Sequence, residues 1–201
     1  MKRYIYLISP QKIRGNKFYK ELDGVLKTNK IKYFQLRLKR RSTSKLLRIS
    51  KKIKKIVKKN KVKFLINDKP LLAKEVNADG CHIGQLDSTV FEARKLLKKK
   101  IIGVTCNNSK SLIKKAVIEG ADYIALGAFY STKTKKVKYK AKIKIIKEAR
   151  KITNVPIVAI GGIKSNNYKK LLLNKANFLA ISSYIWNNKR LTPAEAIRKI
   201  K

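Results

Sequence analysis

The feature that most constrains the fold is an alternation, repeated eight times, of a short apolar run with a longer amphipathic segment. The apolar runs are rich in β-branched residues and have strand lengths, and the amphipathic segments carry lysines at helical spacing. The expected strands cover 3–9, 33–38, 63–68, 80–84, 101–106, 123–129, 156–162 and 178–185. The expected helices cover 16–29, 43–60, 71–77, 88–97, 109–120, 138–153, 166–176 and 192–201. Nearly continuous apolar strands are typical of parallel sheets covered on both faces.

Eight strand–helix pairs in succession favour a closed barrel, because an open doubly wound sheet usually needs fewer strands. The helix starts support this phasing. Ser42, Ser88, Ser109 and Thr192 each stand where a helix N-cap is expected, and Pro193 follows the last of them. No linker or second apolar core interrupts the chain. The sequence therefore predicts an α/β protein that is a single (β/α)₈ TIM-barrel domain over residues 1–201.

The net charge of +41 is unusual and indicates affinity for polyanions such as nucleic acid. The lysines, however, are spread along every expected helix, whereas a dedicated nucleic-acid surface would gather them in one arm or stripe. We therefore expect nonspecific polyanion binding as a side effect of composition. The same charge suits anionic substrates.

Other classes of protein fit the chain poorly. No apolar run reaches 18 residues, and the N-terminal segment lacks the apolar length and cleavage site of a signal peptide. We expect a cytoplasmic protein without a membrane partner. Cys81 and Cys106 are expected to be reduced core residues, and with His82 as the one histidine they offer no zinc-type cluster.

The second expected strand ends in a cluster of polar residues, and barrels of this type hold their active sites at the C-terminal ends of the strands. Gln35, Arg37 and Lys39 alternate along the strand, so they share one face. That face is the barrel interior if Leu36 and Leu38 pack against helices. An Arg with a nearby Lys is a good phosphate clamp, although a merely solvated strand end explains this segment equally well.

Two carboxylates follow the next two strands. Asp68 comes directly after Asn67 at the end of the third strand, and Asp87 lies in the loop after the fourth. Mg²⁺ is usually held by one or two carboxylates together with water and substrate phosphate. The alternative is that each carboxylate pairs with one of the many lysines.

A second phosphate pocket is indicated on the opposite side of the barrel. The sixth strand leads into a loop with hydroxyls and lysines, Ser131 to Lys135. Gly161 and Gly162 end the seventh strand and would let backbone amides approach a phosphate, and the eighth strand carries Ser182 and Ser183. A polar surface loop and a tight glycine turn are the alternatives for the first two segments.

The ordered set of strand-end segments resembles the thiamine-phosphate synthase family from about Tyr6 to Ile185. The matching segments are YLIS, QLRLK, FLIND, ADGCHIGQLD, IIGVT, GADYIALGAFYSTKTK, VPIVAIGGI and the serine-bearing last strand. The resemblance implies a transferase of thiamine biosynthesis with two phosphorylated small-molecule substrates. It would join a pyrimidine diphosphate to a thiazole phosphate, or to its carboxylated form, giving thiamine phosphate and diphosphate. In this family the diphosphate leaves first and the thiazole nitrogen captures the resulting cation.

The resemblance also implies roles for individual residues. The pyrimidine diphosphate would be bound by Gln35, Arg37, Lys39, Asn67, Thr105 and Lys135. Among these, the cations that would stabilise the leaving diphosphate are Arg37, Lys39 and Lys135. The thiazole phosphate would be bound by Thr132, Thr134, Gly162, Ser182 and Ser183. Mg²⁺ would be the cofactor, with Asp68 and Asp87 as its ligands.

Two other functions compete with this one. A thiazole tautomerase-type paralogue shares the barrel and the thiazole pocket but needs neither a diphosphate clamp nor a metal. A catalytically inactive, basic, nucleic-acid-associated barrel would explain the charge but leave the clustered strand-end residues without a role. The sequence specifies no oligomeric state.

Overall fold

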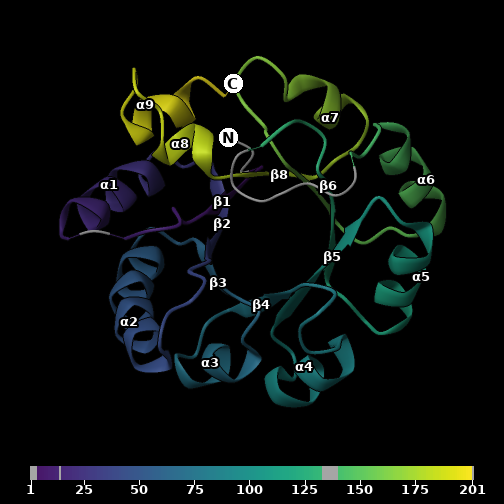
Figure 1. Ribbon diagram of the computed structural model, residues 1–201, viewed down its shortest axis with the longest axis horizontal. Helices are drawn as coiled ribbons and strands as arrows, with labels where there is room; N and C mark the ends of the chain where they lie inside the picture. The colour runs from purple at the N-terminus through teal and green to yellow at the C-terminus, as the bar shows by residue number, and fades with distance from the viewer. Residues whose placement is uncertain (1–3, 14, 133–139, 201) are drawn as a thin grey trace.

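Eight parallel strands close into a barrel in the computed structural model, which describes residues 4–13, 15–132 and 140–200 (Figure 1). Each strand pairs with the next in sequence, and the last pairs with the first. The strands are β1 (Ile5–Ile8), β2 (Ile31–Leu36), β3 (Lys63–Asn67), β4 (Gly80–Ile83), β5 (Ile101–Asn107), β6 (Tyr123–Gly127), β7 (Ile157–Ile160) and β8 (Phe178–Ile181). The predicted (β/α)₈ barrel is confirmed.

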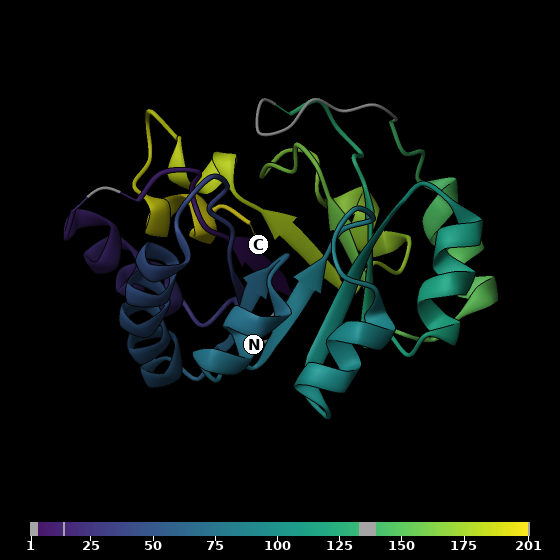
Figure 2. The ribbon, with the colours of Figure 1, turned by 60° about the horizontal axis from the view of Figure 1, so that its bottom comes forward.

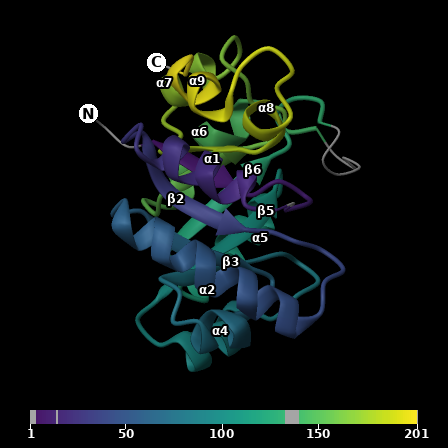
Figure 3. The same ribbon diagram turned by 90° about the vertical axis from the view of Figure 1, so that its left-hand side faces the viewer.

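The helices form a ring outside the strands (Figure 1). They are α1 (Lys17–Leu26), α2 (Thr43–Lys59), α3 (Pro70–Glu75), α4 (Val90–Leu97), α5 (Lys110–Ile118), α6 (Lys144–Ile152), α7 (Lys169–Leu173), α8 (Ser183–Trp186) and α9 (Pro193–Arg198). Helix α1 packs against both α2 and α9, so the end of the chain closes the ring beside its beginning (Figure 3). Over the residues described, no helix combines the length and apolar character needed to cross a membrane.

Apolar side chains are buried in two layers. The larger cluster fills the space between the strands and the helices and includes Leu36 and Leu38. The smaller one fills the barrel interior and includes Tyr6, Leu65 and Tyr123. Leu36 and Leu38 therefore pack outward as predicted, which leaves the alternate residues of β2 for the interior.

The helix starts agree with prediction at three of four positions. Ser109 and Thr192 accept hydrogen bonds from backbone N–H groups of the first turn, and Ser42 holds the N-cap position without such a bond. The N-cap of α4 is Thr89, and not Ser88 as predicted. Thr89 is favoured because it forms a capping box with Glu92. The Thr89 hydroxyl accepts from the Glu92 backbone N–H, and the Glu92 carboxylate accepts from the Thr89 backbone N–H.

The apolar run 178–185 was predicted to be one strand, but only its first half is. The strand β8 ends at Ile181, and the chain turns into α8 at Ser183. Two contacts of Trp186 stabilise the helical turn that replaces the second half of the predicted strand. The Trp186 indole N–H donates to the Ile8 carbonyl over 2.7 Å, and the Trp186 ring packs on Phe18 with 5.4 Å between centroids.

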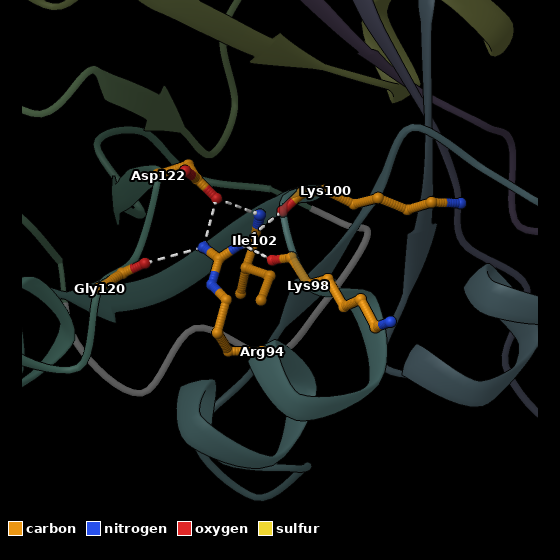
Figure 4. A network of polar contacts seen from close by, with 6 residues as sticks. All are labelled: Arg94, Lys98, Lys100, Ile102, Gly120 and Asp122. Atoms are coloured by element: carbon orange, nitrogen blue, oxygen red, sulfur yellow. Dashed lines mark hydrogen bonds and ion pairs between the residues drawn. The ribbon is translucent and has the colours of Figure 1, made fainter.

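At the N-terminal end of the strands, Arg94 holds β5, β6 and α4 together (Figure 4). Its guanidinium donates to the carbonyls of Lys98, Lys100 and Gly120 and to the Asp122 carboxylate, over 2.6 to 2.9 Å. Asp122 also accepts from the Ile102 backbone N–H at 2.7 Å. A planar five-donor guanidinium can serve these acceptors together.

We expect Arg94→Lys to lower the free energy of unfolding by about 2 kcal/mol, because an ammonium cannot reach acceptors spread over three segments. Urea unfolding followed by circular dichroism measures the change. Arg48→Lys, on the exposed face of α2, is the matched control and should stay within about 0.5 kcal/mol. Equal effects of the two substitutions would contradict this role for Arg94.

Candidate active site

All eight strands run in the same direction, so their C-terminal ends meet at one end of the barrel (Figure 2). At this end, a cavity of about 430 Å³ opens beside β2 and β3. Its polar lining consists of Lys39, Arg40, Arg41, Asn67, Asp68, Lys69 and Asp87. Four of the residues predicted for the diphosphate and its metal, Lys39, Asn67, Asp68 and Asp87, therefore lie around one hollow.

Gln35 and Arg37 lie on the barrel side of the same strand. Gln35 is almost fully buried, and its amide N–H donates to the Asn67 side-chain carbonyl over 2.9 Å. The Arg37 backbone N–H donates to the Ser9 hydroxyl at 2.9 Å. Ser9 is a residue that the sequence analysis missed. It ties the ends of β1, β2 and β8 together, since its carbonyl also accepts from the Ser182 hydroxyl.

The two carboxylates predicted to bind metal lie beside each other. Burial, and after it the neighbouring Asp87, raise the pKa of Asp68 to about 6 against the opposing charges of Lys39 and Arg37. Asp68 has a left-handed backbone, with φ of 61°, and its N–H donates to the His82 carbonyl. Asp87 accepts from the Gly84 backbone N–H at 2.9 Å. These bonds hold both carboxylates at the barrel mouth.

The ion pairs of the described residues involve neither Asp68 nor Asp87. They engage six of the eleven acidic residues: Glu21, Asp23, Asp79, Glu119, Asp122 and Glu148. The alternative that each strand-end carboxylate simply pairs with a lysine therefore finds no support here. Two adjacent carboxylates repel each other when both are charged, which favours the binding of a proton or a cation between them.

The pair fits a magnesium ion in its donor chemistry. No group of three or more His, Cys, Asp or Glu gathers among the described residues, so a site closed by protein ligands alone is absent from that part of the chain. Mg²⁺ instead commonly takes one or two carboxylates and completes its octahedron with water and substrate phosphate. Asp68 and Asp87 supply that partial set.

The second predicted pocket is built around a glycine turn after β7. Gly161 and Gly162 have φ of 103° and 62°, and a Cβ at Gly162 would lie 2.3 Å from the Ser131 carbonyl oxygen. The turn therefore packs directly against the loop after β6 that leads to Thr132. Ser182 and Ser183 lie at the neighbouring end of β8. Thr134 and Lys135 lie outside the described residues.

The arrangement is that of a barrel mouth with a carboxylate and cation site on one side and a glycine and hydroxyl site on the other. Over residues 5–185, the chain matches the family described as thiamine monophosphate synthase. The chain belongs to this family. The resemblance stated from the sequence is thus confirmed over nearly the whole chain.

Individual members of the thiamine monophosphate synthase family show how close the relationship is. The thiamine-phosphate synthase of Pelagibacter ubique is 64% identical over 200 residues, which cover 100% of this chain and 97% of that protein. The enzyme of the same name from Rhodospirillum centenum is 38% identical, covering 92% of this chain and 89% of that protein. These relatives and the family support thiamine phosphate synthesis, a transferase reaction, and nothing in them favours a tautomerase or a binding protein.

Solved structures agree on the fold. A thiamine phosphate pyrophosphorylase from Pyrococcus furiosus superimposes with a TM-score of 0.86, covering 98% of this chain and 93% of that one at 21% identity. A 3-hexulose-6-phosphate synthase superimposes with a TM-score of 0.70 at 14% identity. At such identities the likeness concerns the barrel alone, since many activities share it.

Within this family barrel, Thr105 contacts a residue that the sequence analysis gave no role. The Thr105 hydroxyl lies 2.8 Å from Nε2 of His82, which is buried inside the barrel. Burial, and after it the Arg37 charge, lower the pKa of His82 to about 4, so the imidazole is neutral at neutral pH.

Cys81 and Cys106 are both buried thiols, as predicted. Burial raises the pKa of each thiol to about 12, which leaves them unreactive.

Proposed function

We propose that this chain joins the pyrimidine diphosphate to the thiazole phosphate in a reaction that requires Mg²⁺. The observation that carries the proposal is the adjacent carboxylate pair of Asp68 and Asp87 beside Lys39 at the cavity, since neither carboxylate takes part in the ion pairs of the described residues. The reaction class comes from the family, and the metal requirement comes from this pair. Both substrates are anionic, which suits a chain of net charge +41.

On the pyrimidine side, the chain's own residues bind and stabilise the diphosphate. Gln35 and Asn67 orient the substrate, Arg37 and Lys39 face its phosphates, and Lys135 is proposed to reach the same group. Because negative charge grows on the diphosphate as it leaves, fixed cations nearby lower the barrier. When bound by Asp68 and Asp87, Mg²⁺ would add Lewis-acid stabilisation of the same leaving group.

On the thiazole side, hydroxyls and backbone amides hold the phosphate. We assign this role to Thr132, Thr134, Gly162, Ser182 and Ser183. The Gly161–Gly162 turn lies against the loop before Thr132, so both segments can contribute to one anion site. The attacking thiazole nitrogen already carries a lone pair, so no general base is required for the second step.

We place the reaction in the cytoplasm, where both substrates of a biosynthetic transferase would be made. We also propose weak, nonspecific binding of polyanions by the lysine-covered helices, which would fade as salt is added. Both assignments rest on composition and on the family, and neither is needed for the chemistry.

The metal assignment predicts that Asp87→Asn raises the Mg²⁺ concentration needed for half-maximal activity by about tenfold or more, because a charged ligand is lost. Steady-state rates over a Mg²⁺ titration at saturating substrates measure the shift. Glu75→Gln removes the same charge from an exposed position on α3 and should leave the titration unchanged. An Asp87→Asn enzyme with the wild-type Mg²⁺ requirement would refute the ligand role.

A further inference from the structure

A line of hydrogen bonds crosses the barrel interior from its buried centre to its mouth. The Tyr6 and Tyr123 hydroxyls lie 2.8 Å apart, and the Tyr123 hydroxyl lies 2.8 Å from Nδ1 of His82. Nε2 of His82 lies 2.8 Å from the Thr105 hydroxyl. The four side chains come from β1, β6, β4 and β5, so the barrel closure alone brings them together.

The direction of this line follows from counting its protons. A neutral imidazole carries one N–H, and each hydroxyl carries one O–H, which gives four protons for three contacts. In one direction, Tyr6 donates to Tyr123, Tyr123 donates to Nδ1 of His82, and Nε2–H donates to Thr105. The remaining proton then belongs to the Thr105 hydroxyl, the only member of the line that is not buried.

The opposite direction strands a proton in the core. If Thr105 donates to Nε2, then Nδ1–H donates to Tyr123, Tyr123 donates to Tyr6, and the Tyr6 proton needs an acceptor. Tyr6 is 2% exposed, and the described residues offer its hydroxyl no partner besides Tyr123. If Tyr6 and His82 both donate to Tyr123, the buried Tyr123 hydroxyl proton is the one left without an acceptor. Buried donors without acceptors are rare because they destabilise the fold.

We infer that the line runs in one direction, from Tyr6 to Thr105, which fixes His82 as the Nε2–H tautomer and turns the Thr105 hydroxyl into a donor aimed at the barrel mouth. His82 is thereby a positioning residue that acts through Thr105. A fixed donor selects an acceptor, and the aminopyrimidine offers its aromatic ring nitrogens as acceptors and its amino group as a donor. The Thr105 O–H is therefore available to donate to a ring nitrogen. This last step rests on the proposed placement of the pyrimidine beside Thr105.

The direct test is the tautomer of His82. The chain has one histidine, so protein labelled with ¹⁵N-histidine gives the nitrogen signals of a single imidazole. At neutral pH, we expect a protonated Nε2 and an unprotonated Nδ1. A protonated Nδ1, or rapid exchange between the two tautomers, would overturn the inference. The measurement needs no turnover, so it succeeds or fails independently of the proposed function.

Two matched substitutions test the consequence for the substrate. Tyr123→Phe removes the donor to Nδ1 and frees His82 to change tautomer, so we expect KM for the pyrimidine diphosphate to rise about tenfold, the value of one hydrogen bond. KM for the thiazole phosphate should not change. Tyr6→Phe removes a hydroxyl from the same interior cluster but leaves Tyr123 donating to His82, so both KM values and the tautomer should stay as in wild type.

A merely structural role gives a different pattern. Both substitutions would then lower the melting temperature. The two variants would have the same KM for the pyrimidine diphosphate and the same His82 nitrogen signals. That outcome, or a larger KM effect from Tyr6→Phe than from Tyr123→Phe, contradicts the inference. If Tyr123→Phe fails to fold, the tautomer in the wild-type protein still decides.

Discussion

Asp68→Asn is expected to lower kcat/KM by about a thousandfold or more while making the metal-free protein more stable. The loss arises because the substitution removes a proposed ligand of the Mg²⁺ that would stabilise negative charge on the leaving diphosphate. The gain arises because burial of the Asp68 carboxylate, and after it the neighbouring Asp87, raise the pKa of Asp68 from 3.8 to about 6. An Asn of the same shape carries no charge, so it removes that repulsion.

The pH dependence of stability gives the sign of this effect. A carboxyl group with a raised pKa stabilises the fold in its protonated form, so the wild type should lose this contribution as the pH rises from about 4 through 6. Asp68→Asn should lack that loss. Thermal unfolding in EDTA at pH 4.5 and 7.5 measures the difference between the two proteins. A variant that is inactive because it is less stable would contradict the functional role.

Gly162→Ala is expected to raise KM for the thiazole phosphate by more than about tenfold. The added Cβ would lie 2.3 Å from the Ser131 carbonyl oxygen and 2.8 Å from the Tyr130 carbonyl carbon, so the loop after β6 must move. That loop leads to Thr132, which is proposed to bind the same phosphate. KM for the pyrimidine diphosphate should change far less, because the carboxylate site lies beside β2 and β3.

Gly120→Ala is the matched control. Gly120 also has positive φ, of 82°, but a Cβ there meets nothing within 4 Å. Both substitutions incur the backbone strain of a left-handed alanine, about 1 kcal/mol, and only Gly162→Ala adds the collision with the loop. The ratio of the two variants' KM values for the thiazole phosphate therefore measures the effect of the collision between the turn and the loop after β6. Equal KM values for the thiazole phosphate would contradict this view of the second pocket.

Much of the fold can be predicted from the sequence because its period is simple. Eight strand–helix pairs leave few topologies, and alternation along 33–38 places Leu36 and Leu38 outward, as found. The end of β8 could not be predicted in this way. An apolar run such as 178–185 is compatible with either a strand or a buried helix. The hydrogen bond from the Trp186 indole to the Ile8 carbonyl, which favours the helix, joins residues that are far apart in the sequence.

Part of the candidate site can likewise be predicted from the sequence, and part cannot. Polar residues at strand ends, such as Asp68 and Asp87, can be found by their position after an apolar run. The line from Tyr6 to Thr105 was missed because its tyrosines and His82 lie within apolar runs, where they look like ordinary core residues. Tyr6 and Tyr123 are 117 residues apart, and only the closure of the barrel sets them in contact. The signal that would have found them is the position of these polar side chains within their strands, because alternation places them on the interior face of the barrel.

The most direct test of the central claim is to mix the purified protein with the pyrimidine diphosphate, the thiazole phosphate and Mg²⁺, and to follow both products. We predict thiamine phosphate and diphosphate in equal amounts, only when both substrates are present, with turnover abolished by EDTA and restored by excess Mg²⁺. No product from correctly folded protein under these conditions would contradict the synthase assignment, and turnover that persists in EDTA would contradict the metal site.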